Sequence, residues 1–219
     1  MHKIVQNLLT IENEIKLNLN YKSNDKLPKI IAVSKTFNIE RILPLIDYGH
    51  LDFGENKVQE ANDKWSDIKV KNPNIKLHML GKLQTNKVKL ALKIFDYIHS
   101  LDSEKLALKI SEEQKKNNKK LKFFIQINIG NEKQKSGVDK DNLINFYNYC
   151  KKLNLDVIGL MCIPPIENDP VKYFEIMSDL RNFINLEELS MGMSSDYLEA
   201  SKNSSTYLRI GTGIFGKRI

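Results

Sequence analysis

Apolar and polar residues alternate along the chain in blocks whose spacing predicts helices and strands in turn. The first block has the three- and four-residue spacing of one face of an amphipathic helix, with apolar residues at Ile4, Leu8, Ile11, Ile15 and Leu19. The next block, 29–34, contains a continuous apolar run over 30–33 and predicts a buried strand. A polar segment over 22–26 is the expected linker between them.

The same rhythm continues to the end of the chain. Strands are predicted at 51–56, 76–81, 97–102, 122–129, 157–163, 188–192 and 206–211. Helices are predicted between them at 39–48, from 57 to about 64, at 83–95, from 104 to the lysine-rich segment 114–120, and at 140–153, 170–183 and 196–201. Each strand except the last is thus followed by a helix.

Two prolines and a serine bear on where three of these helices begin and whether they are continuous. Pro44 argues against an uninterrupted helix over 39–48, whose inward residues are expected to be Ile42, Leu43, Leu45 and Ile46. Ser103 is a candidate cap for the helix that follows it. Pro170 stands in the first turn of its helix, where proline is well tolerated.

Regular alternation of strands and helices predicts a parallel sheet. Eight such units over about 190 residues fit a single TIM-type (β/α)8 barrel that occupies 1–219, with the helix in 1–22 packed on it as an addition. An open, doubly wound sheet is the alternative, because periodicity does not show whether a sheet closes.

Composition narrows the class of protein. The net charge is +7, but only four of the 34 basic residues are arginine, so a solvated lysine coat is favoured over a nucleic-acid footprint. Cys150 and Cys162 lack the spacing of a zinc site or a disulfide framework, and no metal site is expected. No signal peptide or membrane span of about 18 apolar residues is present. The expected protein is cytoplasmic, binds neither nucleic acid nor membrane, and is a monomer.

Lys35 is the first candidate for chemistry. It follows Ile30, Ile31, Ala32 and Val33, so an ammonium group stands at the mouth of a buried strand. Burial favours the neutral amine, which attacks carbonyl groups to form Schiff bases. The alternative is a strand-end lysine that simply reaches back to solvent.

Polar residues follow the other predicted strands, which would meet at the active face of a barrel. They are Gly54, Glu55, Asn56, His78, Gly81, Ser100, Asp102, Asn128, the segment 190–194 and the segment 209–212, with Met161 beside them. The segments 190–196 and 209–216 carry the glycines and hydroxyls of a phosphate site, which TIM barrels often place after strands 7 and 8. The alternative is a pair of glycine-rich turns.

Arg209 stands beside this predicted phosphate turn. It could clamp a phosphate, donate to the ring nitrogen of a heterocycle, or form a structural salt bridge with a barrel acid. A strand-end lysine, a phosphate site and a neighbouring arginine together match the aldehyde, phosphate and pyridine nitrogen of pyridoxal 5′-phosphate (PLP).

Seven segments resemble the pyridoxal phosphate homeostasis proteins, the YggS/PROSC family. They are AVSKT (32–36), FGENKVQE (53–60), HMLGKLQTNK (78–87), QINIGNEKQKSGV (126–138), GLMCIPP (159–165), LSMGMSSD (189–196) and LRIGTGIFGKR (208–218). The resemblance implies a fold similar to the N-terminal barrel of bacterial alanine racemase, with PLP held as an internal aldimine.

The resemblance also implies roles for individual residues. Lys35 would form the Schiff base, and Arg209 would face the pyridine nitrogen. Ser194, Gly211, Thr212 and Gly213 would hold the phosphate, and Asn56 would line the pocket. Secondary candidates are His78, Met191, Gly192 and Lys135, the last as a second, weaker aldehyde contact.

Three positions depart from the family pattern: Ser204 replaces a glycine, Cys162 a threonine, and Phe37 a frequent lysine. The phenyl group at 37 argues against a cofactor hand-off through a neighbouring amine.

The chain ends soon after the last predicted strand, so the second domain and the tyrosine acid of racemases are not expected. An arginine at the ring nitrogen also weakens the electron sink. We therefore expect a binder of PLP that serves PLP homeostasis and PLP-dependent apo-enzymes without turnover; the alternative is a racemase-like enzyme.

Overall fold

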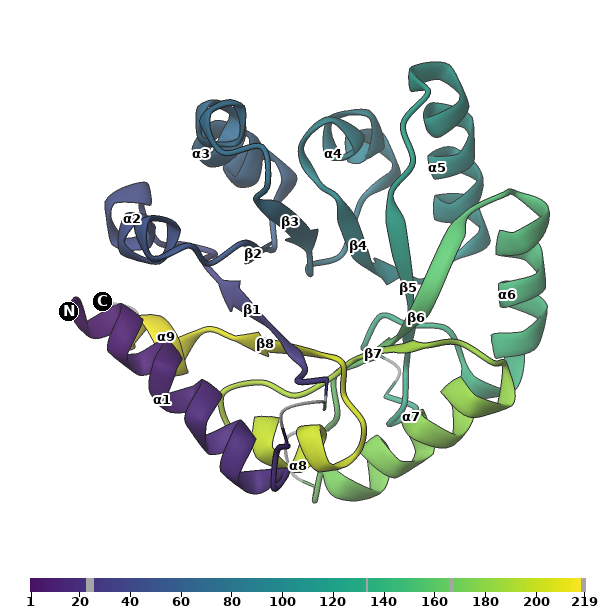
Figure 1. Ribbon diagram of the computed structural model, residues 1–219. Helices are drawn as coiled ribbons and strands as arrows, with labels where there is room; N and C mark the ends of the chain where they lie inside the picture. Colours follow the sequence, from purple (N-terminus) through teal and green to yellow (C-terminus); the bar gives the residue numbers. More distant parts are fainter. Residues whose placement is uncertain (23–25, 133, 166–167, 218–219) are drawn as a thin grey trace.

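Eight parallel strands close into a barrel in the computed structural model, which describes residues 1–22, 26–132, 134–165 and 168–217 (Figure 1). The strands are β1 (Lys29–Val33), β2 (Asp52–Glu55), β3 (Lys76–Met79), β4 (Tyr97–Leu101), β5 (Lys122–Ile127), β6 (Asp156–Cys162), β7 (Glu188–Ser190) and β8 (Tyr207–Ile210). Each pairs with the next, and β8 pairs with β1 in a register that runs from Lys29↔Tyr207 to Ala32↔Ile210. This closure confirms the TIM-type barrel and excludes the open sheet. The predicted linker lies mostly outside the described residues, as does Arg218.

Helices surround the strands as an outer layer (Figure 1). They are α1 (Lys3–Asn18), α2 (Ile39–Tyr48), α3 (Val58–Lys71), α4 (Val88–Ile94), α5 (Glu104–Asn117), α6 (Leu143–Lys152), α7 (Val171–Phe183), α8 (Tyr197–Lys202) and α9 (Thr212–Phe215), with short 3-10 turns at Thr85–Lys87 and Lys140–Asn142. The predicted N-terminal helix is confirmed, and α1 packs against α2, α8 and α9.

Several boundaries differ from the sequence prediction. Helix α3 continues to Lys71 rather than ending near Lys64, because Trp65 extends its buried face by another turn. Pro44 does not interrupt α2; the carbonyl of Glu40, which loses its helical partner, belongs to an exposed residue that water can reach. Leu43 points outward, contrary to expectation. Ser103 occupies the cap position of α5, but its side chain makes no capping hydrogen bond.

The barrel interior is partly polar. Its apolar side chains form a small cluster of their own: Ile31, Tyr97, Phe124, Met161 and Tyr207. Leu77 and Met79 belong instead to the larger core beneath the helices, so the intervening His78 faces the barrel interior. His99, Ser190 and Arg209 are buried as well. Burying this many polar groups requires that they bond to one another.

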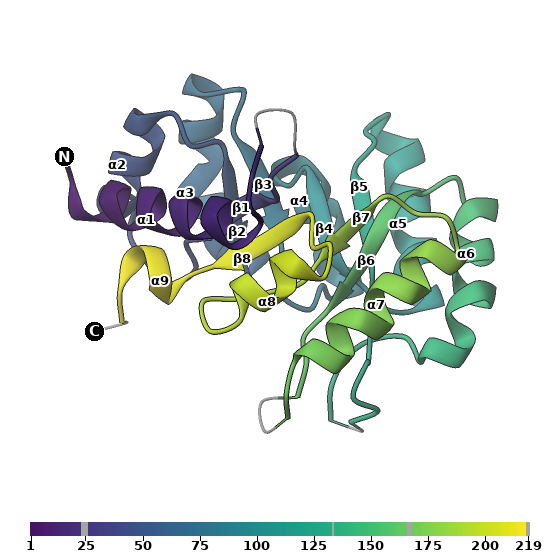
Figure 2. The same cartoon turned by 60° about the horizontal axis from the view of Figure 1, so that its bottom comes forward.

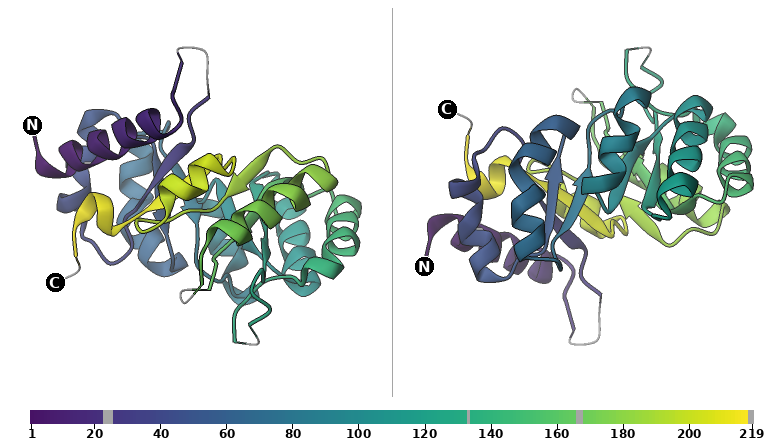
Figure 3. Two further views of the ribbon diagram at one scale, coloured as in Figure 1. Left: turned by 90° about the horizontal axis from the view of Figure 1, so that it is seen from below. Right: turned by 90° about the horizontal axis from the view of Figure 1, so that it is seen from above.

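The loops that follow β5 and β6 project together from one end of the barrel, opposite the segment that enters β1 (Figures 2 and 3). This is the end where the parallel strands finish, and it carries the candidate site. Away from it, Ser204 has a φ of 63°, a left-handed conformation that suits the glycine of the family pattern. No helix among the described residues is long and apolar enough to cross a membrane.

Candidate functional site

A cavity of about 340 Å³ opens where the strands end. Its lining comes from the ends of β1 and β8 and from the segments that follow β1, β2, β3, β6, β7 and β8: Val33, Lys35, Asn56, Leu80, Ile163, Met193, Ser194, Ser195, Arg209, Gly211 and Thr212. The size lies within the range of small-molecule sites. The structure thus gathers Lys35, Asn56, Ser194, Arg209, Gly211 and Thr212 around one space, as the sequence predicts.

Lys35 stands in a tight turn directly after β1. The next residue, Thr36, has a φ of 69°, which is unusual for a β-branched residue and requires support from its surroundings. The support comes from α3, because the backbone N–H of Thr36 donates to Oε1 of Glu60 at 2.5 Å. Lys35 is half-buried and lines the cavity, as does Arg209 of β8.

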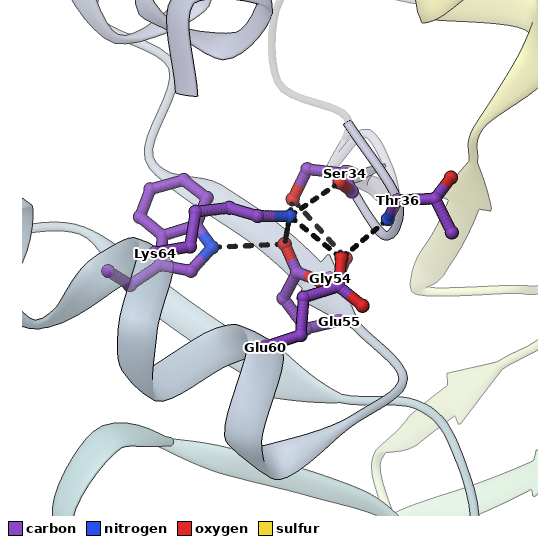
Figure 4. Close-up of polar contacts among 7 residues, drawn as sticks. Ser34, Thr36, Gly54, Glu55, Glu60 and Lys64 are labelled. Carbon is purple, nitrogen blue, oxygen red and sulfur yellow. Dashed lines mark hydrogen bonds and ion pairs between the residues drawn. The ribbon is translucent and has the colours of Figure 1, made fainter. Parts of the chain in front are cut away.

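The residue before Lys35 is held by a second set of contacts (Figure 4). The Ser34 hydroxyl donates to Glu55 Oε1 at 2.7 Å, and the Lys64 ammonium donates to the carbonyl oxygen of Ser34 at 3.0 Å. Lys64 also pairs with Glu55 at 2.9 Å and with Glu60 at 3.0 Å. Both neighbours of Lys35 are therefore tied to one buried cation and its two carboxylates.

Glu55 is the centre of this cluster and is fully buried. Its Oε1 atom also accepts a hydrogen bond from the indole N–H of Trp65 at 3.0 Å. Burial alone would raise the pKa of Glu60, but the Thr36 N–H and the Lys64 ammonium outweigh it and lower that pKa. The cluster therefore keeps a charged carboxylate beneath the Lys35 turn.

The predicted phosphate site is a hydroxyl- and glycine-rich corner between the β7 loop and α9. The backbone N–H of Gly213 donates to Ser194 Oγ at 3.1 Å, which leaves the Ser194 hydroxyl hydrogen available to a ligand. A Cβ at Gly213 would lie 3.0 Å from Ile210 and 3.3 Å from Ile11, so only glycine fits without displacement. Helix α9 starts at Thr212; the sequence had predicted only a turn there.

Arg209 is buried between this corner and the barrel interior, with 5% of its surface exposed. Its two terminal nitrogens donate to Ser190 Oγ and to the carbonyl oxygen of Cys162, both at 2.8 Å. None of the ion pairs among the described residues involves Arg209, so the predicted alternative of a direct salt bridge is wrong for this part of the chain. Burial lowers the pKa of the guanidinium.

The secondary candidates lie apart from the cavity lining. His78 faces the barrel interior, and Met191 is buried in the core. Gly192 has a φ of 89° and packs closely against Ala200, so its role is to shape the turn after β7. Lys135 lines a neighbouring cavity of about 330 Å³ and pairs with Glu132.

Apolar side chains complete the cavity in a way that the sequence interpretation missed. Leu80, Ile163 and Met193 line it beside the polar groups. Leu80 and Ile163 follow β3 and β6, so the rule that assembles the polar strand ends would also have found them. Phe37, which stands where the family pattern has a lysine, packs on Phe215 with ring centres 5.0 Å apart.

Comparison with known proteins identifies the class. Residues 13–218 match the family model of the alanine racemase N-terminal domain, the class of barrel that this fold and site define. The chain is 38% identical over 203 residues to the pyridoxal phosphate homeostasis protein of Vibrio cholerae, covering 87% of this chain and 85% of that one. It is 39% identical over 200 residues to the pyridoxal phosphate homeostasis protein of Aquifex aeolicus, covering 87% of each chain. The chain therefore belongs to the pyridoxal phosphate homeostasis protein family.

Solved structures show the same architecture. PipY of Synechococcus elongatus, solved with PLP bound, is 30% identical and superposes with a TM-score of 0.83 over 97% of this chain and 100% of that one. The structure of PipY without PLP gives a TM-score of 0.85 at 31% identity, with the same coverage. Alanine racemase of Clostridium difficile, at 15% identity and a TM-score of 0.75, shares the fold over 99% of this chain and 57% of its own.

Proposed function

We propose that this chain binds PLP in the 340 Å³ cavity and serves PLP homeostasis in the cytoplasm, holding the cofactor for PLP-dependent apo-enzymes without turning over a substrate. The observation that carries the proposal is the convergence of an amine, a guanidinium and hydroxyl groups on one cavity, from Lys35, Arg209, Ser194 and Thr212. This donor set fits an aldehyde, a ring nitrogen and a phosphate. The names of the relatives and the bound ligand of PipY support it.

Lys35 would hold the cofactor covalently. A neutral lysine amine can condense with an aldehyde and release water, and this is the chemistry that Lys35 would supply to bound PLP. Ser194, Thr212 and the backbone of Gly211 would bind the phosphate as hydrogen-bond donors, Gly213 would hold the Ser194 hydroxyl in place for it, and Asn56 would line the pocket.

Proton transfer to a substrate needs a second acid or base opposite Lys35. The cavity lining among the described residues includes no histidine, tyrosine, cysteine or carboxylate. Arg209 stays protonated and would face the ring nitrogen as a donor, which keeps that nitrogen unprotonated and weakens electron withdrawal. Both features favour storage over catalysis.

Absorbance spectroscopy tests the covalent attachment. Purified protein mixed with PLP should show a visible band that Lys35→Ala abolishes and borohydride fixes to Lys35, as located by peptide mass spectrometry. Lys82→Ala is the matched control, because Lys82 lines the two neighbouring cavities and not this one. A wild-type protein with no band and no bound PLP would refute the proposal.

Isotope exchange separates a binder from a racemase-like enzyme. The PLP-loaded protein is incubated with L- and D-alanine in deuterated water, and the α-proton signal is followed by NMR. We expect no exchange beyond that of free PLP. Rapid exchange that depends on Lys35 would overturn the storage role and favour the enzyme.

A further inference from the structure

A continuous chain of hydrogen bonds crosses the barrel interior from the cavity to the opposite end. Arg209 donates to Ser190 Oγ at 2.8 Å, and Ser190 Oγ lies 2.8 Å from Nδ1 of His99. Nε2 of His99 lies 2.9 Å from Nδ1 of His78, and Nε2 of His78 lies 3.0 Å from Oδ1 of Asp52. Asp52 is the first residue of β2, at the end of the barrel away from the cavity.

The carboxylate end of the chain and the neutrality of the two buried rings fix the position of every hydrogen along it. A carboxylate only accepts, so Nε2 of His78 donates to Asp52, and burial, which lowers the pKa of both imidazoles, leaves each ring with one hydrogen. Nδ1 of His78 is then an acceptor, so the hydrogen of His99 is on Nε2 and goes to it. Nδ1 of His99 in turn accepts the hydroxyl hydrogen of Ser190, whose oxygen accepts from Arg209. All five groups therefore point the same way.

The surroundings keep water out of this chain. His99 stacks on Phe124 with ring centres 4.2 Å apart, and His78 stacks on Tyr97 at 4.4 Å. Both imidazoles are fully buried, and burial lowers the pKa of each, most strongly that of His99. Two neutral rings thus join a buried cation to a carboxylate whose side chain is 22% exposed.

We propose that Asp52, acting through His78, His99 and Ser190, is the hydrogen-bonded counter-charge of Arg209 and fixes the orientation of its guanidinium at the cavity. Arg209 lines the cavity and forms no ion pair among the described residues; Asp196 acts on it through space, whereas this chain links it by hydrogen bonds to the Asp52 carboxylate. The effect on cofactor binding rests on the proposed function, whereas the direction of the hydrogens does not. Asp52, His78 and His99 are then positioning residues that do not touch the ligand.

The chain does not conduct protons to the cavity. Transfer along it would need Arg209 to give up a proton at its cavity end, and a guanidinium does not do so in proteins. Its role is therefore electrostatic and geometric.

Nitrogen NMR of the full-length, 15N-labelled protein without added PLP tests the hydrogen positions. The four histidines are assigned with His2→Gln and His50→Gln, which leave the buried pair. We expect both buried rings to be neutral at pH 7 with the hydrogen on Nε2. A hydrogen on Nδ1 of either ring, or a cationic ring, would overturn the proposal whether or not PLP binds.

A double-mutant cycle tests the coupling to the cavity. Asp52→Ala should weaken PLP binding about tenfold, the scale of losing one hydrogen bond to a charged group. Asp156→Ala is the matched control, because Asp156 is the exposed first residue of β6 at the same end of the barrel. Asp156→Ala should change PLP binding by less than about twofold. In an Arg209→Gln background, Asp52→Ala should have no further effect.

Equal weakening by Asp52→Ala in both backgrounds would refute the link and assign Asp52 a structural role only. If Asp52→Ala does not fold, Asp52→Asn replaces it, since the amide keeps an acceptor oxygen and removes the charge. That variant should retain the histidine hydrogens and still weaken PLP binding; unchanged binding would refute the counter-charge. A wild-type protein that does not bind PLP would refute the proposed function and leave the NMR result to decide the hydrogen chain.

Discussion

Removing the Lys64 ammonium should destabilise the protein strongly. The ammonium lies 2.9 Å from Glu55 Oε1 and 3.0 Å from Glu60 Oε1, with 9% of the Lys64 side chain and none of the Glu55 side chain exposed. Breaking a buried ion pair by removing one partner costs about 3–5 kcal/mol, because the remaining charge is left without compensation. The Ser34 and Trp65 donors still contact Glu55, so we expect Lys64→Met to cost about 3 kcal/mol of unfolding free energy.

Urea unfolding can measure this loss. Trp65 is the only tryptophan and lies in the cluster, so its fluorescence reports the local structure, while far-UV circular dichroism reports the whole barrel. The free energy is compared at equal slope, since a changed slope would indicate a different unfolded or native state. Lys71→Met, at the exposed end of the same helix, is the matched control and should change stability by less than about 0.5 kcal/mol.

The double variant Glu55→Gln/Lys64→Met identifies the cause. With both charges gone, it should be more stable than the sum of the single losses predicts, by about 1–3 kcal/mol. If Lys64→Met costs no more than Lys71→Met, or if the two single losses simply add, the buried ion pair does not stabilise the Lys35 turn.

Three further outcomes are expected. Ser204→Gly should raise the unfolding free energy by about 0.5–1 kcal/mol in urea melts, because glycine adopts the positive φ without strain; a loss of stability would show that the serine side chain matters more. Burial raises the pKa of both Cys150 and Cys162 to about 12, so neither thiol should react with a disulfide reagent at pH 8 until the protein unfolds. The lowered pKa of Glu60 stabilises the fold above the ordinary glutamate pKa of about 4.3, and this contribution is lost as pH falls through the lower folded value; Glu60→Gln should reduce the acid sensitivity of unfolding.

Much of this fold and site follows from local patterns in the sequence. The apolar runs ending at Val33 and Cys162 identify strands because a parallel sheet buries both faces. Once the strands are parallel, their carboxyl ends must share one face, so Lys35 and Arg209 could be expected together despite their separation in the sequence. The roles that the family resemblance assigns to these residues toward PLP stay predictions.

The two groups of buried polar side chains, one between β2 and α3 and one inside the barrel, were not predicted. The residues that bond to one another in them are far apart in the sequence and form no local motif. Glu55 pairs with Lys64 nine residues away, and His78 bonds to His99 twenty-one residues away. Lysines are so frequent here that none stands out as buried. His78 was expected near the rim; the apolar residues on either side of it, which face the helices, could have indicated that it points into the barrel.

Short elements were missed for a different reason. Helix α9 has four residues, too few to show a 3.6-residue period, and glycine at its start suggests a turn. The segment 83–95 was predicted as one helix, but it starts with the 3-10 turn Thr85–Lys87 and becomes α-helical only at Val88. Such ends depend on packing against neighbours rather than on periodicity.

The seam between β1 and β8 has a consequence for biosynthesis. Lys35 follows the first strand and Arg209 belongs to the last, so the cavity is complete only after the ribosome has delivered β8 and the two strands have paired. A nascent chain lacking β8 should therefore fail to capture the cofactor. A ligand that contacts residues on both sides of this seam stabilises the closed barrel. At a hundred times its dissociation constant, it adds about 2.7 kcal/mol to the apparent free energy of unfolding. Cofactor supply would then influence how long the finished barrel stays closed.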